Sequence, residues 1–205
     1  MASPTSNPTG PVHGDRARSR APVRLRAGAV VVEFLWAGDR WRHVVTAPDD
    51  GGDRHGSPGH RQGLDGWHSL EGPVAPLHDP RRPGSPVITE LSVVGPAEAP
   101  RALLGVGHAG CSHCSLAVTV DDDDPSALRF EVACRLSAAW PGLGSAYRHH
   151  AAGKSVAALA LQPHPGAPRQ TLAWTYRFGP AGLVTIEGAV WQAGEPGGNR
   201  ADAPT

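Results

Sequence analysis

The sequence predicts an all-β fold, an antiparallel β-sandwich of about eight or nine strands in one domain. Apolar and polar residues alternate with a period of two along several segments, which is the pattern of strands with one buried and one solvated face. Turn signals rich in Gly, Pro and Asp separate these segments, so neighbouring strands are expected to form hairpins. No segment shows the period of about 3.6 residues that indicates an amphipathic helix. Antiparallel strands in this number usually pack as two sheets or close into a barrel.

The N-terminal part predicts a leader followed by a hairpin. Residues 1–24 hold Pro, Ser, Gly and Arg with little to bury, so we expect a disordered leader. The first strand begins near Arg26, the turn is at residues 37–39, and the two strands present apolar side chains at alternate positions. Val30, Val32, Phe34 and Trp36 share one face of the first strand, and on the second Trp41, His43 and Val45 alternate with Arg40, Arg42 and Val44. Residues 48–84 form a long Gly-rich loop, which Trp67 and Leu70 would anchor to the body of the domain.

The middle of the chain carries the clearest pattern. Strands are predicted at residues 86–94 and 102–107, followed by a hairpin over residues 112–136. Its turn is the run Asp121 to Asp124, whose consecutive carboxylates favour a solvated turn over a calcium loop. If Val120 pairs with Leu128, Cys114 lies opposite Cys134.

The C-terminal part predicts further strands and a loose tail. Residues 140–147 form a loop, and residues 155–162 are compatible with a strand or a short helix. Residues 169–178 and 183–191 form the last two strands, joined by a turn at 179–182. The domain would therefore span residues 25–192, and residues 193–205 would be a disordered tail.

Composition argues against two classes of partner. The chain of 205 residues has 19 basic and 19 acidic residues, a balance that does not fit an electrostatic nucleic-acid binder. No apolar run reaches the roughly 20 residues that span a bilayer, so no membrane partner is expected. The N-terminus lacks the apolar stretch of a secretory signal, which favours a cytoplasmic location. A disulfide between Cys114 and Cys134 is conceivable, but that location favours reduced thiols.

Known catalytic and metal motifs are weak or missing. Cys111 and Cys114 could form half of a zinc site with His108 and Cys134, but an odd spacing puts strand side chains on opposite faces. The G-x-G-x-x-G match at residues 105–110 leads into a strand instead of a helix, so it does not predict dinucleotide binding. We therefore expect a non-catalytic protein with no cofactor and no metal.

The outward faces of the strands are the predicted place of function. Polar side chains alternate outward there, and we expect three aromatic residues from loops to rim the same face. The candidate ligand-binding residues are Glu90, His113, Arg129, Glu131 and Arg135 on the sheet, with Trp67, Trp140 and Tyr147 at the rim. Aromatic rings beside carboxylates and arginines suit a sugar, so the expected partner is a carbohydrate or a protein. The competing interpretation is an ordinary solvated sheet with cross-strand ion pairs.

Three segments resemble small proteins of planctomycete-type bacteria. They are residues 103–118 (LLGVGHAGCSHCSLAV), 130–135 (FEVACR) and 143–148 (LGSAYR), within a similarity that spans about residues 28–192. This resemblance implies no activity and no catalytic residue.

A looser likeness, of fold alone, is to β-sandwich proteins of the galactose-mutarotase type, which bind sugars on a sheet face. It implies an alternative function as a sugar-processing enzyme, with His113 as acid and Glu90 or Glu131 as base. A second alternative is a structural zinc protein that uses Cys111 and Cys114.

Overall fold

The computed structural model describes residues 20–47, 66–71, 84–136, 143–149, 153–159, 170–187 and 189–193. In this part of the chain all regular structure is strand, and every pairing between strands is antiparallel, so the all-β antiparallel prediction is confirmed. The strands are β1 (Val23–Ala27), β2 (Val30–Trp36), β3 (Trp41–Thr46), β4 (Trp67–Ser69), β5 (Val87–Val94), β6 (Ala102–Ala109), β7 (Ser112–Val120), β8 (Leu128–Arg135), β9 (Gly144–His149), β10 (Lys154–Leu159), β11 (Thr171–Gly179), β12 (Gly182–Glu187) and β13 (Ala189–Ala193). No helix among the described residues is long and apolar enough to span a membrane.

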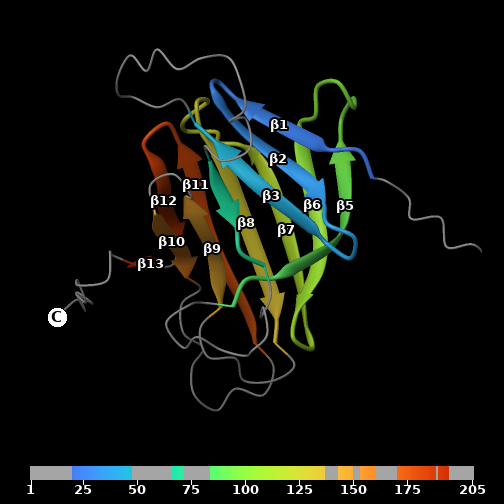
Figure 1. The fold of residues 1–205 in the computed structure, drawn as a ribbon, viewed down its shortest axis with the longest axis vertical. Coiled ribbons are helices and arrows are strands. Elements are labelled where there is room, and N and C mark those ends of the chain that lie inside the picture. The colour runs from blue at the N-terminus through green and yellow to red at the C-terminus, as the bar shows by residue number, and fades with distance from the viewer. Residues whose placement is uncertain are drawn as a thin grey trace, which may run out of the picture.

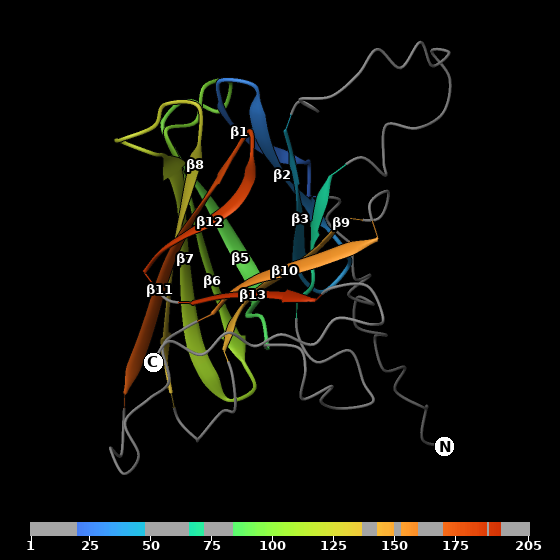
Figure 2. The ribbon, with the colours of Figure 1, turned by 90° about the vertical axis from the view of Figure 1, so that its left-hand side faces the viewer.

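The predicted sandwich of eight or nine strands is wrong, because the thirteen described strands belong to one hydrogen-bonded sheet. Its order is β12-β11-β8-β7-β6-β5-β3-β4-β9-β10-β13, with β2 and β1 extending from β3 as a branch. The sheet bends until β12 and β13, at the two ends of this path, come into contact. The result is a nearly closed, barrel-like sheet whose walls face each other (Figures 1 and 2).

Strand β3 joins the two halves of this sheet. One edge of β3 pairs with β2 along its whole length, while the other pairs with β4 at Val44 and Val45 and with β5 where Trp41 meets Ile88. Strand β4 in turn pairs with β9, which continues to β10 and β13. These pairings link segments far apart in sequence, so local alternation alone does not reveal them.

The predicted alternation of buried and solvated side chains is confirmed. Inward residues from opposite walls form one apolar core, and it is rich in aromatic rings. Its largest fully buried side chains are Trp174, Tyr147, Tyr176, Phe34, Phe130, Phe178, Leu103 and Leu128. Burying one side chain of this size stabilises the folded protein by about 1.5–3 kcal/mol, so these residues hold the two walls of the sheet together.

The central hairpin has the predicted register. Val120 pairs with Leu128, which places Cys114 opposite Cys134 with 4.1 Å between their Cα atoms. The two cysteines form a disulfide, so the expectation of reduced thiols is wrong. Inward residues that lie directly opposite each other on paired strands are close enough for this bond. The sequence-based argument for a reducing compartment therefore loses its support.

The turn of this hairpin is organised by its first aspartate. The buried Asp121 carboxylate accepts hydrogen bonds from the backbone amides of Asp123 and Asp124, at 2.9 and 3.0 Å. Asp124 in turn accepts from the backbone amide of Ser126 at 3.0 Å. The acidic run is thus a hairpin turn, as predicted, but its own side chains stabilise it and Asp121 is buried instead of solvated.

Three other segments differ in detail. Strand β5 has a bulge between Ile88 and Glu90, so Val87 and Ile88 are both buried. The predicted loop at residues 140–147 becomes strand β9 from Gly144 onward, and the predicted strand at 183–191 is two strands, β12 and β13. Strand β10 confirms the strand alternative for its segment. The leader up to residue 19, the tail from residue 194 and most of the 48–84 connection lie outside the described residues.

Candidate functional site

The five sheet residues predicted to bind a ligand do lie on the outer face of β5, β7 and β8. His113 is paired with Arg135 across the β7–β8 ladder, and Arg129 forms an ion pair with Glu131 with 3.0 Å between Nη2 and Oε1. Glu90 lies two strands away from His113, about 12 Å between Cα atoms by ordinary strand spacing, so these two side chains are not neighbours. The ion pair on the outer face therefore runs along β8 and is not the predicted cross-strand pair. Glu131 is paired with Ala117, four residues along β7 from His113, so neither proposed base lies beside the proposed acid.

Two of the three predicted rim aromatics, Trp67 and Tyr147, do not lie around this face. Trp140 lies outside the described residues. Tyr147 is on β9 and is completely buried inside the sheet, so its predicted loop position is wrong. Trp67 is the half-buried first residue of β4, where it packs on the core and contacts His149 edge to face, with 5.2 Å between ring centroids. Trp67 is thus an anchor, as expected, but neither it nor Tyr147 offers a ring on which a sugar could stack at the outer face.

The proposed zinc ligands are also separated. Cys114 is bonded to Cys134 through its sulfur, and a thiolate is what zinc requires. Within the described ranges no group of three His, Cys, Asp or Glu side chains is arranged to hold a metal ion.

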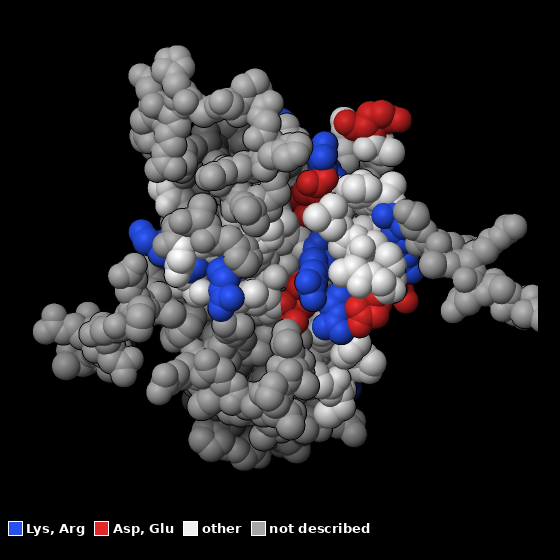
Figure 3. Space-filling model, in the orientation of Figure 1, with Lys and Arg blue, Asp and Glu red and all other residues white. Residues whose placement is uncertain are grey.

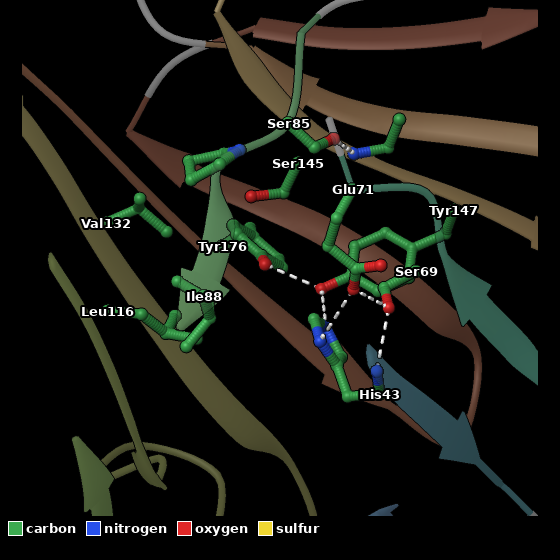
Figure 4. Close-up of a pocket in the computed structure, with 12 residues that line it drawn as sticks. His43, Ser69, Glu71, Ser85, Ile88, Leu116, Val132, Ser145, Tyr147 and Tyr176 are labelled. Carbon is green, nitrogen blue, oxygen red and sulfur yellow. Dashed lines mark hydrogen bonds and ion pairs between the residues drawn. The ribbon is translucent and has the colours of Figure 1, made fainter. Parts of the chain in front are cut away.

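A cluster of buried polar side chains lies instead inside the sheet (Figure 4). It contains His43 of β3, Ser69 of β4, Glu71 just after β4, Tyr147 of β9 and Tyr176 of β11. His43, Glu71 and both tyrosines are buried. Elements far apart in sequence bring these groups together because β3, β4 and β9 are consecutive in the sheet and β11 lies on the opposite wall.

A chain of hydrogen bonds connects His43 to the far wall. The Nε2 atom of His43 is 2.8 Å from the Tyr147 hydroxyl, and this hydroxyl is 2.7 Å from that of Tyr176. Tyr176 is also hydrogen-bonded to Ser145, whose Oγ accepts from the indole N–H of Trp174 at 3.0 Å. Since an indole nitrogen can only donate, a consistent direction runs from Trp174 through the hydroxyls to His43 Nε2.

The ring of His43 is neutral in this environment. Burial lowers its pKa from 6.5 to about 3, because the charged imidazolium would lose its hydration. Its ring stacks on Phe34 with 4.7 Å between centroids. If Nε2 accepts from Tyr147, the single proton of the neutral ring is on Nδ1. Nδ1 has no hydrogen-bond partner and faces Glu71 Oε1 at 3.6 Å.

Glu71 is held at the edge of the cluster by Ser69. The Ser69 hydroxyl donates to Glu71 Oε1 and accepts from the backbone amide of His43 at 2.8 Å. Burial raises the pKa of Glu71, while the hydrogen bond from Ser69 and the charges of Arg42 and Arg40 oppose this rise. Burial also raises the pKa values of Tyr147 and Tyr176, so both hydroxyls stay protonated and can donate.

These groups line a cavity of about 30 Å³. Ile88, Leu116 and Val132 make its apolar end, and the polar end is formed by the cluster together with Ser85 and Ser145. Figure 4 shows the three aliphatic residues on one side, Glu71, Ser69 and His43 on the other, and Tyr176 between them. A water molecule needs about 10–15 Å³ by this measure, so the cavity has room for about two or three non-hydrogen atoms.

Sequence reasoning found only part of this site. The sequence puts His43 in phase with Trp41 and Val45, and a histidine in phase with apolar residues is the signal that could have identified it. Tyr176 is in phase with Trp174 and Phe178 on β11, which is a signal of the same kind. Ser69 and Glu71 lie in a connection without periodicity, so nothing in the local sequence marked them as buried.

Comparison with models of protein families, with curated proteins and with solved structures finds no match to this chain.

Proposed function

We propose that this protein binds a very small molecule in the interior cavity, with one polar and one apolar end. The observation that supports this most is the convergence of buried polar groups from both walls on a space that is otherwise lined by aliphatic side chains. Buried polar groups cost free energy unless they are hydrogen-bonded, and His43 Nδ1 has no hydrogen-bond partner. A cavity with a few convergent polar groups and shifted pKa values is the usual form of a ligand site.

The cavity volume limits both the size and the affinity of the ligand. The best small ligands gain about 1.5 kcal/mol per non-hydrogen atom, so three atoms correspond to a Kd of about 1 mM or weaker. A hexose ring is far too large for this space. The carbohydrate expected from the sequence is therefore not proposed for the cavity.

A thermal-shift experiment tests this proposal with ethanol, acetamide, acetate and ethylammonium, each at 100 mM and equal ionic strength. A probe with a Kd of about 10 mM would stabilise the protein by about 1.4 kcal/mol, which raises Tm by a few degrees. Val132→Phe fills the apolar end of the cavity and should abolish the shift. Val184→Phe, at an exposed position on β12, is the matched control and should keep it. If no probe raises Tm, the proposal is refuted.

A second candidate function is contact with another protein through the outer face of β5–β8, as the sequence suggested. Leu104 and Val106 are 44% and 52% exposed there, next to the small residues Ser115, Ala117 and Ala133. Without a described aromatic ring on this face, a protein is a better-supported partner than a sugar. On the face around β1–β3, which Figure 3 shows, positive and negative side chains are mixed and do not form a basic patch.

The simplest protein partner is a second copy, which light scattering over a range of protein concentrations would detect. Val106→Glu should remove any association, while Ile186→Glu on β12, 43% exposed in the wild type, should not. A monomer at every concentration would refute self-association.

A further inference from the structure

Within the part of the chain that the structure describes, the buried carboxylate of Glu71 has no fixed cationic partner. Among the described residues, its ion-pair contact is with His43 Nδ1 at 3.6 Å, and the neutral state of His43 brings no charge to this contact. Arg40 and Arg42 influence Glu71 only from a distance beyond that of a salt bridge. An ionised carboxylate in this position is only weakly compensated, and burial accordingly raises the pKa of Glu71.

The surroundings of Glu71 offer hydrogen-bond acceptors to an incoming donor. The hydroxyl oxygens of Ser85, Ser145 and Tyr176 line the same cavity, and each can accept a hydrogen bond. An ammonium group carries three N–H donors and no acceptor. The rings of Tyr147 and Tyr176 also line this space, and aromatic faces attract cations. The apolar end formed by Ile88, Leu116 and Val132 would receive a short alkyl group.

We propose that the cavity selects a small primary amine in its protonated form, with Glu71 as the counter-ion. This inference rests on the proposed function and names its ligand class. An anion would meet Glu71 without any fixed positive charge to balance it. A neutral alcohol could use the hydroxyl groups, but it would leave the buried carboxyl group without an ionic partner.

Proton release gives a direct test on the wild-type protein. Calorimetric titration with ethylammonium chloride in two buffers of different ionisation enthalpy measures the number of protons released on binding. Burial raises the pKa of Glu71 and pairing with a cation favours its ionised form, so we expect proton release on binding at acidic pH and tighter binding as pH rises. Binding with no proton release at any pH below neutrality would overturn the inference.

Variants provide the second test. Glu71→Gln keeps the shape of the side chain and removes its charge, so ethylammonium affinity should fall at least tenfold. Glu131→Gln, on the outer face, is the matched control and should bind as the wild type does. If Glu71→Gln binds ethylammonium as tightly as the wild type, the inference is wrong.

The neutral and anionic probes separate the two proposals. If ethanol or acetamide binds and ethylammonium does not, the cavity is a ligand site but not an amine site. If none of the probes binds, both the proposed function and this inference fail.

Discussion

Replacing Tyr147 by Phe should destabilise the protein by about 2–6 kcal/mol, although the side chain keeps its ring. The Tyr147 hydroxyl is completely buried and lies 2.8 Å from His43 Nε2 and 2.7 Å from the Tyr176 hydroxyl. Two hydrogen bonds of about 0.5–1.5 kcal/mol each are lost, and a buried group left without its partner costs about 1–3 kcal/mol. The ring contacts with Phe178 and His43 should persist, so the loss reports on the hydroxyl alone.

Equilibrium unfolding in urea, followed by tryptophan fluorescence, measures this loss. The double variant with Tyr176→Phe should cost less than the sum of the two single variants, because it removes both partners of one hydrogen bond. A loss below 0.5 kcal/mol for Tyr147→Phe, or strictly additive effects, would show that the hydroxyl chain does not contribute as the structure indicates.

Three further predictions follow from other features. Because the pKa of His43 falls from 6.5 in the unfolded chain to about 3 in the folded protein, the unfolded state binds more protons between these values. Stability should therefore decline as pH falls through this window, by up to about 1.4 kcal/mol per pH unit, and pH-dependent urea unfolding of His43→Phe should lack this component. Gly107→Ala should severely disrupt the β5–β6 pairing, since a Cβ would lie 1.9 Å from a β5 carbonyl oxygen. Gly179→Ala has its closest such contact at 3.7 Å and should have little effect on thermal unfolding. Reducing the Cys114–Cys134 disulfide, which spans 20 residues, should cost about 3 kcal/mol, and a reductant that leaves the urea midpoint unchanged would contradict this.

Much of the fold could be predicted because a period of two identifies the inward face of each strand. This held for Phe130 and Val132 and for the pairing of Cys114 with Cys134, which depend only on local alternation and a short turn. Sheet closure depends instead on pairings such as β3 with β4 and β4 with β9, which join residues separated by long connections. Alternation is the same in a sandwich and in a barrel, so it could not decide between them.

The site was harder to predict than the fold for a related reason. Tyr147 follows a Gly-rich segment that has the composition of a loop, but pairing with β4 and β10 converts it to a buried strand position. Glu71 is buried where residues of β3, β9 and β11 line the same cavity. A charged residue near glycines ordinarily indicates solvent exposure, and only tertiary contacts reverse that expectation.

Cys111 could compete with Cys114 for the bond to Cys134 when the chain folds in the presence of an oxidant. Cys111 precedes Cys114 by three residues, so a bond from Cys111 to Cys134 would shift the ladder by an odd number. A shift of this kind exchanges the two faces of a strand and would turn Phe130 and Val132 toward water. The Cys114–Cys134 bond can therefore form only when β7 and β8 pair in the native register. A Cys111–Cys134 bond would hold β8 with its apolar face toward solvent.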